Sequence, residues 1–279
     1  MAIPATCVIL GFGYSAGYIA TELKRLGTNV IGVTRDPTKQ HPDASLSGWD
    51  KPETKALLAK ADAILVSVPP GPGQEAAIKL VQDNAKTDCW LGYLSATSVY
   101  GDHQGRWVDE TTPTSPCNSM ARNRLAAEQA WQVLPEHAIF RLSGIYGPGR
   151  SILERLQRGN ARYVIAPDHA FSRIHVEDIG RLVAKAIFRR VTGIYNVADS
   201  MPAPSHQLVE YGCRILGLPL PNPEYLPTIH KGDPLWNFYD ANKRVDGSKI
   251  LKELEICLLY PTYHSGLGQT GKLLARKLA

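Results

Sequence analysis

The sequence has few of the features that mark membrane, metal-binding or disulfide-bonded proteins. Its five cysteines are scattered and form no CxxC pair, so neither a zinc site nor a disulfide framework is predicted. No apolar run reaches the length of about 18 residues that a membrane helix needs. The N-terminus has no basic segment followed by a long apolar stretch, so no signal peptide is expected. A reduced, cytoplasmic setting agrees best with these absences.

Charge of one sign is not concentrated anywhere along the chain. Lys and Arg total 31 against 26 Asp and Glu, a formal net charge of +5. Without a dense basic run, no nucleic-acid partner is predicted, and the modest positive excess suits a small anionic ligand. The 279 residues suffice for one large α/β domain, or for a core domain with a smaller lobe.

The first half of the chain alternates buried apolar runs with amphipathic segments. Such alternation predicts βαβ units, and therefore an α/β fold with a doubly wound parallel sheet of the Rossmann type. After Gly147, prolines break the chain into short pieces, and only 176–190 (a helix) and 193–198 (a strand) look regular. In the first half, the expected strands are 6–10, 29–34, 44–47, 61–68, 89–95 and 138–142, and the expected helices are 16–26, 52–59, 74–84 and 122–131.

A glycine-rich turn links the first expected strand to the first expected helix. Gly11 permits a tight turn, Gly13 lets the backbone approach a pyrophosphate, and Ala16 lets the helix pack close to the sheet. Free amides at the start of the helix then suit phosphate groups. A glycine turn that only connects two elements is the alternative, but the βαβ context favours a dinucleotide site. The GxGxxA form of the fingerprint is present as Gly11, Phe12, Gly13, Tyr14, Ser15 and Ala16.

The end of the second expected strand discriminates between NAD and NADP. An acidic residue there would bind the ribose 2′-hydroxyl of NAD and repel a 2′-phosphate. The chain has Thr34 and Arg35 instead, and a hydroxyl with a guanidinium suits the 2′-phosphate of NADP. Asp36 follows and could take the NAD role. The sequence therefore predicts NADP and leaves NAD open.

Several longer stretches make the sequence similar to a known family. The chain resembles atypical members of the extended short-chain dehydrogenase/reductase family, in its NAD-dependent epimerase/dehydratase group. The resemblance implies an NAD(P)-binding Rossmann domain over 1–147, completed by about 176–198, and a smaller C-terminal substrate lobe over 148–279. The similar stretches are GFGYSAGYIA at 11–20, YLSATSVYGD at 93–102, RLSGIYGPGR at 141–150, RIHVEDIG at 173–180 and, more weakly, YNVADS at 195–200.

The resemblance also implies cofactor contacts outside the glycine turn. Val68, Pro69 and Pro70 follow the fourth expected strand and would lie along the cofactor. Ser95, at the end of the next strand, would face the nicotinamide ribose. Asp50 matches an acidic residue that the family places near the adenine.

The residues that carry out the family's usual chemistry are replaced. Typical members have a Ser or Thr after the fifth strand and a YxxxK motif on the next helix, in which the Tyr is the acid/base. Alignment on the pair 127–128 puts Met120 at the Tyr position and Arg124 at the Lys position, and alignment on the stretch 99–101 puts Ala96 at the hydroxyl position. Methionine cannot exchange a proton. Arg124 can still hold a ribose or phosphate, but its permanent charge makes it a poor proton shuttle.

Three hypotheses for the chemistry remain open. Another side chain supplies the proton, or water does, or the protein binds NADP(H) without turnover. His175 titrates nearest neutrality, although a structural histidine that braces the lobe is the alternative. No cluster of His, Asp and Glu has metal-ligand spacing, so no metal is expected. The side chains considered as proton donors are Thr97, Ser98, Tyr100, His103, Tyr146 and His175.

The sequence therefore predicts an NADP-dependent oxidoreductase or epimerase/dehydratase that acts on a small polar or nucleotide-sugar-like substrate. Its candidate catalytic residues are Thr97, Tyr100, Arg124 and His175. The alternative is a non-catalytic NADP(H)-binding sensor or assembly protein. From the resemblance, a homodimer is a further expectation, paired through helices such as those expected at 74–84 and 122–131.

Overall fold

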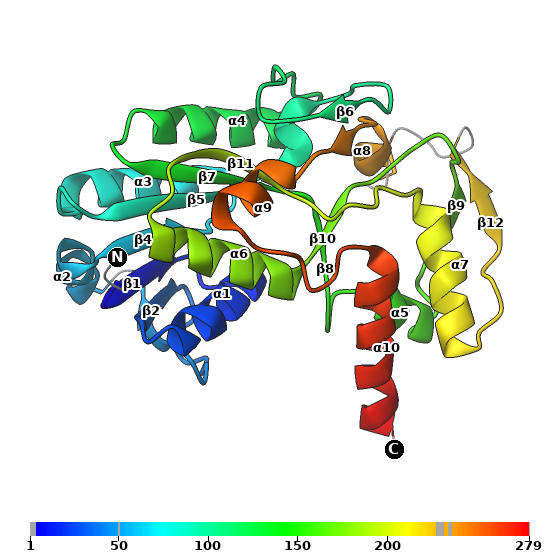
Figure 1. Ribbon diagram of the computed structural model, residues 1–279, viewed down its shortest axis with the longest axis horizontal. Helices are drawn as coiled ribbons and strands as arrows, with labels where there is room; N and C mark the ends of the chain where they lie inside the picture. Colours follow the sequence, from blue (N-terminus) through cyan, green and yellow to red (C-terminus); the bar gives the residue numbers. More distant parts are fainter. Residues whose placement is uncertain (1–3, 50, 227–231, 234–235, 279) are drawn as a thin grey trace.

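The centre of the molecule is a seven-stranded parallel sheet, seen in a computed structural model that describes residues 4–49, 51–226, 232–233 and 236–278 (Figure 1). Its spatial order is β3-β2-β1-β4-β5-β7-β11. Because this order reverses beside β1, the carboxyl ends of β1 and β4 flank the crevice where open α/β sheets bind ligands. The predicted Rossmann-type fold is confirmed. The strands are β1 (Thr6–Leu10), β2 (Asn29–Thr34), β3 (Ser45–Gly48), β4 (Ala63–Val66), β5 (Trp90–Ala96), β7 (His137–Leu142) and β11 (Gly193–Val197).

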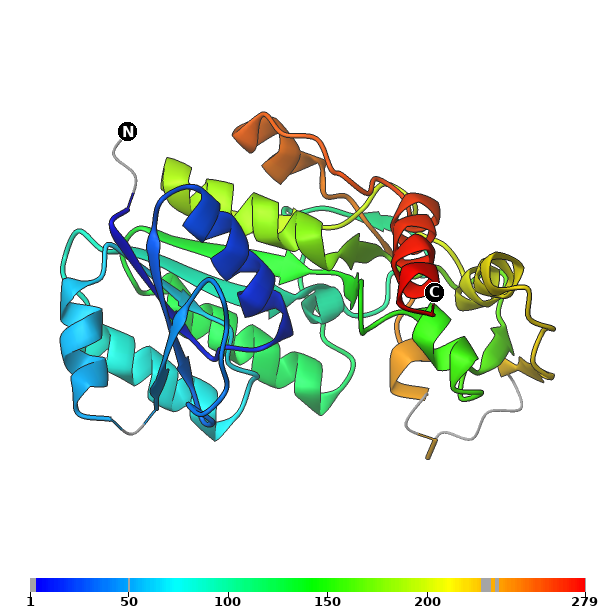
Figure 2. The ribbon, with the colours of Figure 1, turned by 90° about the horizontal axis from the view of Figure 1, so that it is seen from below.

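Helices cover both faces of the sheet (Figure 2). Helices α1 (Tyr14–Arg25) and α6 (Val176–Arg189) pack together on one face. The other face carries α2 (Glu53–Lys60), α3 (Pro72–Asn84) and α4 (Ser119–Gln132). Since both faces are covered, the central strands are apolar throughout, which is why they stand out in the sequence.

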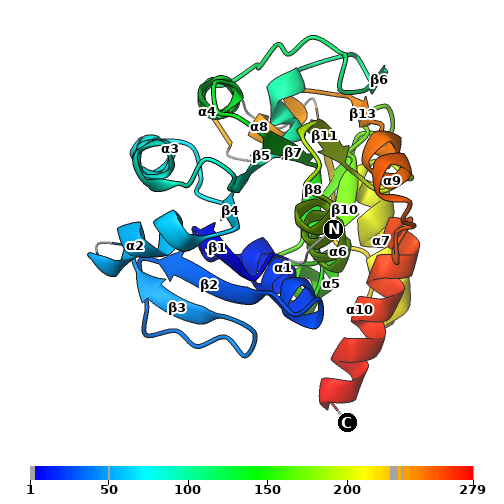
Figure 3. The same ribbon diagram turned by 60° about the vertical axis from the view of Figure 1, so that its left-hand side comes forward.

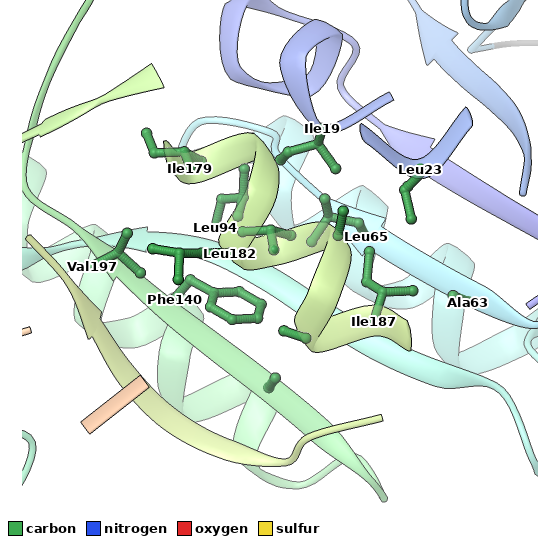
Figure 4. Close-up of a cluster of buried hydrophobic side chains, with 14 of the residues drawn as sticks. Ile19, Leu23, Ala63, Leu65, Leu94, Phe140, Ile179, Leu182, Ile187 and Val197 are labelled. Atoms are coloured by element: carbon green, nitrogen blue, oxygen red, sulfur yellow. The ribbon is translucent and has the colours of Figure 1, made fainter. Parts of the chain in front are cut away.

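Helix α6 shows how the core is packed. Its apolar residues recur at helical spacing, so one side of the helix is buried while the other is polar. That side lies over the sheet between α1 and the strands (Figure 4). The contacting side chains are Ile179, Leu182 and Ile187 of α6, Ile19 and Leu23 of α1, and Leu65, Leu94, Phe140 and Val197 of the sheet.

The smaller lobe lies beyond the carboxyl ends of the strands (Figures 1 and 3). Two short parallel pairs frame it: β8 (Gly144–Tyr146) with β10 (Arg173–His175), and β9 (Tyr163–Ile165) with β12 (Pro223–Tyr225). A third short parallel pair is formed by β6 (Trp107–Val108) and β13 (Arg244–Val245). The lobe therefore faces the carboxyl-terminal edge of the sheet, where the glycine turn follows β1. Its helices are α5 (Ile152–Gln157), α7 (Ser205–Leu216), α8 (Trp236–Tyr239) and α10 (Tyr263–Leu278).

The lobe is more regular than the sequence predicted. The expectation that only two stretches after Gly147 are regular was wrong, because the prolines at 204 and 219 flank α7 rather than interrupt it. The short helix α9 (Ser248–Leu254) also packs back onto α6 and β11. Part of the segment 148–279 therefore covers the sheet rather than the lobe.

Within the described ranges, no helix combines the length and the apolar character that spanning a membrane would require.

Candidate cofactor and substrate site

The first glycine of the turn is required by the backbone itself. Gly11 has φ +86°, and a Cβ placed on it would lie 2.9 Å from the amide nitrogen of Val68. A side chain would therefore strain the backbone and collide with the segment that leaves β4. The turn and the residues after β4 are held in close contact at the crevice between the two strands.

The second glycine leaves open space in front of a helix. Gly13 is the N-cap of α1, and no side chain caps the helix there. A Cβ on Gly13 would meet nothing within 4 Å among the described residues. The first turn of α1 contains no acidic residue. Uncapped amides, a positive helix end and free space fit the pyrophosphate of a dinucleotide.

A cavity of about 510 Å³ lies between this helix end and the loop after β2. Thr34, which the sequence predicts as a cofactor contact, lines it together with Lys39, which was not predicted. Arg35 is exposed just outside it. The Asp36 carboxylate accepts hydrogen bonds from the amide and hydroxyl of Thr38, at 3.2 and 2.5 Å. The other oxygen of Asp36 lies 3.9 Å from Nζ of Lys39, in an exposed ion pair, and the Thr34 hydroxyl accepts from the Asp36 amide. Arg35 is therefore the cation of this turn that has no carboxylate within 4.0 Å among the described residues.

The other residues predicted to contact the cofactor lie in different surroundings. Val68, Pro69 and Pro70 form the loop that leaves β4, beside Gly11, as the resemblance implies. Asp50 lies outside the described residues. The hydroxyl of Ser95 does not face the crevice, because it is buried and donates to Oε1 of Glu128 at 2.5 Å. The expectation that this side chain faces a ribose was wrong.

Ser95 belongs to a buried polar network that the sequence did not reveal. Glu128 of α4 pairs with Arg141 of β7 at 2.8 Å, and both side chains are almost completely buried. Arg141 also donates to the hydroxyl of Tyr100 at 2.9 Å, which in turn donates to Oδ1 of Asn196 at 2.8 Å. The network therefore ties α4 to three strands of the sheet. The sequence offered one signal, an acidic residue on the sheet-facing side of an otherwise apolar helix segment.

Tyr100 cannot serve as the acid that was predicted. It is fully buried, and both neighbours of its hydroxyl belong to the network. Burial raises the pKa of Tyr100 despite the nearby Arg141 guanidinium. Because the phenol is out of reach of a bound molecule, its role is structural.

Met120 and Arg124 stand on α4 at the positions where typical family members have Tyr and Lys. Met120 is 73% exposed in the first turn of α4 and offers no polar atom. Arg124 donates to the hydroxyl of Tyr93 at 2.9 Å and to the carbonyl of Leu94 at 3.1 Å. Its guanidinium is therefore held at the carboxyl end of β5, where it can supply charge but not a proton.

His175 is a structural residue, so its predicted catalytic role was wrong. It is 1% exposed and is the N-cap of α6, where Nδ1 accepts from the amide of Glu177 at 3.3 Å. Its ring packs against Tyr146 and Tyr260. Burial lowers its pKa from 6.5 to about 4, so the ring stays neutral, as an N-cap acceptor must.

This neutral histidine makes stability depend on pH. Between pH 6.5 and 4 the unfolded chain gains a proton at His175 that the folded protein does not. The free energy of unfolding therefore falls as pH falls through that window. His175→Asn keeps an acceptor for the helix and removes the titration. We expect the fall to be smaller in the variant by about 3 kcal/mol, measured by urea unfolding at each pH.

Comparison of the two pH curves isolates this one group. Asp199, whose pKa burial raises to about 7, has the opposite effect, because its protonated form is favoured in the folded state. It is present in both proteins and cancels in the difference. Parallel curves for the wild type and His175→Asn would contradict the assignment.

A second, larger cavity of about 690 Å³ separates the sheet domain from the lobe. Thr97 and Ser98 line it from the end of β5, so Thr97 remains a candidate for contact with a bound molecule. Tyr146 lines it as well, but its hydroxyl lies 3.4 Å from the carbonyl of Thr262. His103 does not line it, and its Nε2 lies 3.1 Å from the carbonyl of Tyr100.

The charge of the larger cavity is positive. Arg150, Arg155 and Arg158 line it, and within the described ranges no carboxylate lies within 4.0 Å of their guanidinium groups. The carboxylates that line it already have partners: Glu154 accepts from the amides of Gly149 and Ser151, and Asp240 accepts from Asn118. Three arginines thus remain available to a ligand.

Residues that line the two cavities contact each other at the first turn of α1. The hydroxyl of Tyr14 donates to the carbonyl of Pro148 at 2.9 Å, and the guanidinium of Arg150 lies 5.8 Å above the Tyr14 ring. Tyr14 lines the smaller cavity and Arg150 the larger. A molecule bound among the arginines would therefore lie next to one bound at the glycine turn. No group of three His, Cys, Asp or Glu able to hold a metal occurs in the part of the chain described.

Solved structures with the same fold include a close relative. A functionally unknown conserved protein from Silicibacter pomeroyi DSS is 37% identical, with TM-score 0.88, over 96% of this chain and 98% of that chain. A protein from Methylobacillus flagellatus described as an NAD-dependent epimerase/dehydratase is 23% identical, with TM-score 0.78, over 99% and 100%. The human epimerase family protein SDR39U1, solved with NADPH, is 15% identical, with TM-score 0.77, over 96% and 99%. No protein-family model matches the chain, and no curated sequence matches it significantly.

These comparisons confirm the resemblance at the level of the fold. The chain shares its overall fold with the protein described as an NAD-dependent epimerase/dehydratase, over 99% of its length. The chain belongs to the same family as the Silicibacter pomeroyi protein.

Proposed function

We propose that the protein is an NADP(H)-dependent oxidoreductase or epimerase/dehydratase whose substrate is a small polar anion of the nucleotide-sugar kind. The observation that carries this proposal is the arrangement of the two cavities. Three arginines without carboxylate partners line the larger one, and it adjoins an uncapped helix end behind a GxGxxA turn. Anionic groups on both the cofactor and the substrate would neutralise this charge.

The chain's own residues would hold the cofactor by backbone and charge. The amides at the start of α1 bind the pyrophosphate in the space that Gly13 leaves open. Thr34, Arg35 and Lys39 hold the 2′-phosphate, and Arg124 holds a ribose or phosphate oxygen near the end of β5. When bound, the nicotinamide ring supplies or accepts a hydride.

The NADP preference has a direct test in Arg35 and Lys39. We expect Arg35→Ala and Lys39→Ala each to weaken NADPH binding by about tenfold, because each removes one charge-assisted contact with the 2′-phosphate. NADH, which lacks that phosphate, should bind the variants as it binds the wild type. Titration of protein fluorescence with both cofactors measures this. An equal loss of affinity for NADPH and NADH would show that these side chains do not contact the 2′-phosphate.

The substrate class is tested by turnover. Purified protein is incubated with NADPH or NADP⁺ and a panel that pairs phosphorylated and nucleotide-linked sugars with their uncharged counterparts. Turnover confined to the anionic members, and a higher KM in Arg155→Ala, is the expected result. Turnover of uncharged aldehydes or ketones at equal efficiency would contradict the proposed substrate class.

A second function is favoured by one observation, the loss of the family's acid/base residues. Met120 and Ala96 exchange no proton, and Tyr100 is buried. A protein that binds NADP(H) and responds to its redox state without turnover would have the same turn and cavities. Tight NADPH binding together with no reaction across the anionic panel would favour this non-catalytic function. A homodimer and a cytoplasmic location remain proposals, made from the resemblance and the reduced cysteines.

A further inference from the structure

The larger cavity contains one amine whose role nothing above explains. Lys243 lines it, between α8 and β13, and is half-buried. Within the described part of the chain, no carboxylate lies within 4.0 Å of its Nζ. A half-buried lysine without an ion-pair partner is uncommon, because burial of the ammonium is unfavourable unless another group compensates.

The backbone on both sides of Lys243 is firmly held. The amide of Asn242 donates to Oδ1 of Asp102 at 2.8 Å, and the carbonyl of Asn242 accepts from the amide of His103 at 2.9 Å. On the other side, the amide of Arg244 donates to the carbonyl of Arg106 at 2.9 Å, in the β13–β6 pair (Figure 3). The backbone from which the Lys243 side chain extends is therefore held in place on both sides, as the support of an acid/base group needs to be.

Lys243 shares its cavity with residues at the end of β5 and at the start of α4. Thr97 at the end of β5 and Cys117 and Asn118 at the start of α4 line the same cavity. Asn118 is the N-cap of α4, and the first turn of that helix carries Met120 at the tyrosine position. The cavity that Lys243 lines from the lobe is therefore also lined by the segment that precedes the family's tyrosine position on α4.

We propose that Lys243 is the acid/base group of this cavity, exchanging a proton with the oxygen of the substrate's hydroxyl or carbonyl group. This inference rests on the proposed function and adds the proton-exchanging group to it. In the oxidative direction, the substrate's C–H bond gives hydrogen with two electrons to the nicotinamide dinucleotide. Its O–H bond gives the proton to the neutral Nζ, and a C=O double bond forms. Reduction reverses each transfer, so atoms and charges balance.

The electrostatic surroundings agree with this role. Burial lowers the pKa of Lys243, while Cys117, Asp240 and Asp102 act in the opposite direction. The fourth titratable group that faces it, His169, is itself buried with a lowered pKa and adds no stable positive charge. A lysine with a lowered pKa supplies neutral amine nearer to neutral pH, as the lysines that act as general bases do.

The first test measures the amine itself and needs no turnover. Lysines are reductively methylated with ¹³C-formaldehyde, and the methyl resonances are followed by NMR as pH rises. We expect the resonance missing from Lys243→Met to titrate below the ordinary lysine value of about 10.4. Titration at or above that value would overturn the proposal. Lys252→Met, which removes an exposed lysine of α9, is the matched control for assignment.

The second test separates proton exchange from simple attraction of an anion. Lys243→Met is expected to lower kcat by about 100-fold or more while NADPH binds as before. Lys243→Arg keeps the charge but exchanges no proton, so it should lose kcat as well. Recovery of kcat in Lys243→Arg would overturn the proposal and make the residue a charge contact. If the wild type fails to bind NADPH, the proposed function fails, whereas the NMR titration still decides the state of Lys243.

Discussion

Replacing Gly13 with alanine is expected to weaken NADPH binding by about 100-fold while leaving the protein folded, because the methyl group occupies the space a pyrophosphate needs. Gly13 has φ −114°, a value that alanine adopts without strain, and nothing among the described residues lies within 4 Å of the added atom. A loss of affinity would therefore show that the bound cofactor occupies the space beside Gly13. Fluorescence titration gives the affinity, and thermal unfolding confirms the fold.

Gly11 provides the matched comparison. In Gly11→Ala the added carbon meets the backbone of Val68 at 2.9 Å, at a positive φ. This variant should lower the free energy of unfolding by about 1–3 kcal/mol even without any cofactor. A Gly13→Ala protein that binds NADPH with unchanged affinity would show that the cofactor does not lie on this turn.

Removing one member of the buried pair between Glu128 and Arg141 should have the largest effect on stability. Glu128→Met leaves the Arg141 guanidinium buried without its counter-charge, which costs about 3–5 kcal/mol. Glu128→Gln keeps hydrogen-bonding atoms and should lose less. Urea unfolding measures each loss. The cause is the desolvated charge, since Arg141 is only 4% exposed and cannot turn to water.

Two comparisons separate this cause from ordinary loss of contacts. The double variant Glu128→Met with Arg141→Met removes both charges and should be more stable than Glu128→Met alone. Arg25→Ala breaks the ion pair with Glu22, in which the Arg25 side chain is 70% exposed. This variant should change the free energy of unfolding by less than about 1 kcal/mol. Equal stability of Glu128→Met and the wild type would show that the network contributes nothing.

The sheet domain could be predicted from the sequence because its signals are local. Strands buried on both faces leave continuous apolar runs, and the helices between them keep one apolar face. For β1 and β2 the predicted and observed bounds coincide, at Thr6–Leu10 and Asn29–Thr34. The lobe was harder to predict because its strands are short and its prolines stand beside its helices, where they resemble breaks in a loop.

The chemistry of the site was predicted less well than its fold. Tyr100 and His175 have the atoms of an acid/base, but packing encloses one in a polar network and makes the other a helix cap. The residues 242–244 could be read from the sequence either as a contact for an anionic substrate or as a surface turn. Arg158 became a candidate only because the end of α5 and the residue before β13, far apart in the chain, line one cavity. Proximity across such separations leaves no mark on spacing or composition.

The sequence by itself determined the turn at Gly11 and Gly13, since a positive φ and an open helix end are properties of the local backbone. It also determined the parallel sheet, through the apolar strands. Only the tertiary structure decided which polar groups are buried with partners, as Ser95 is, and which meet in a cavity without them, as Lys243 does. The reason is that burial and pairing depend on what the rest of the chain places around each side chain.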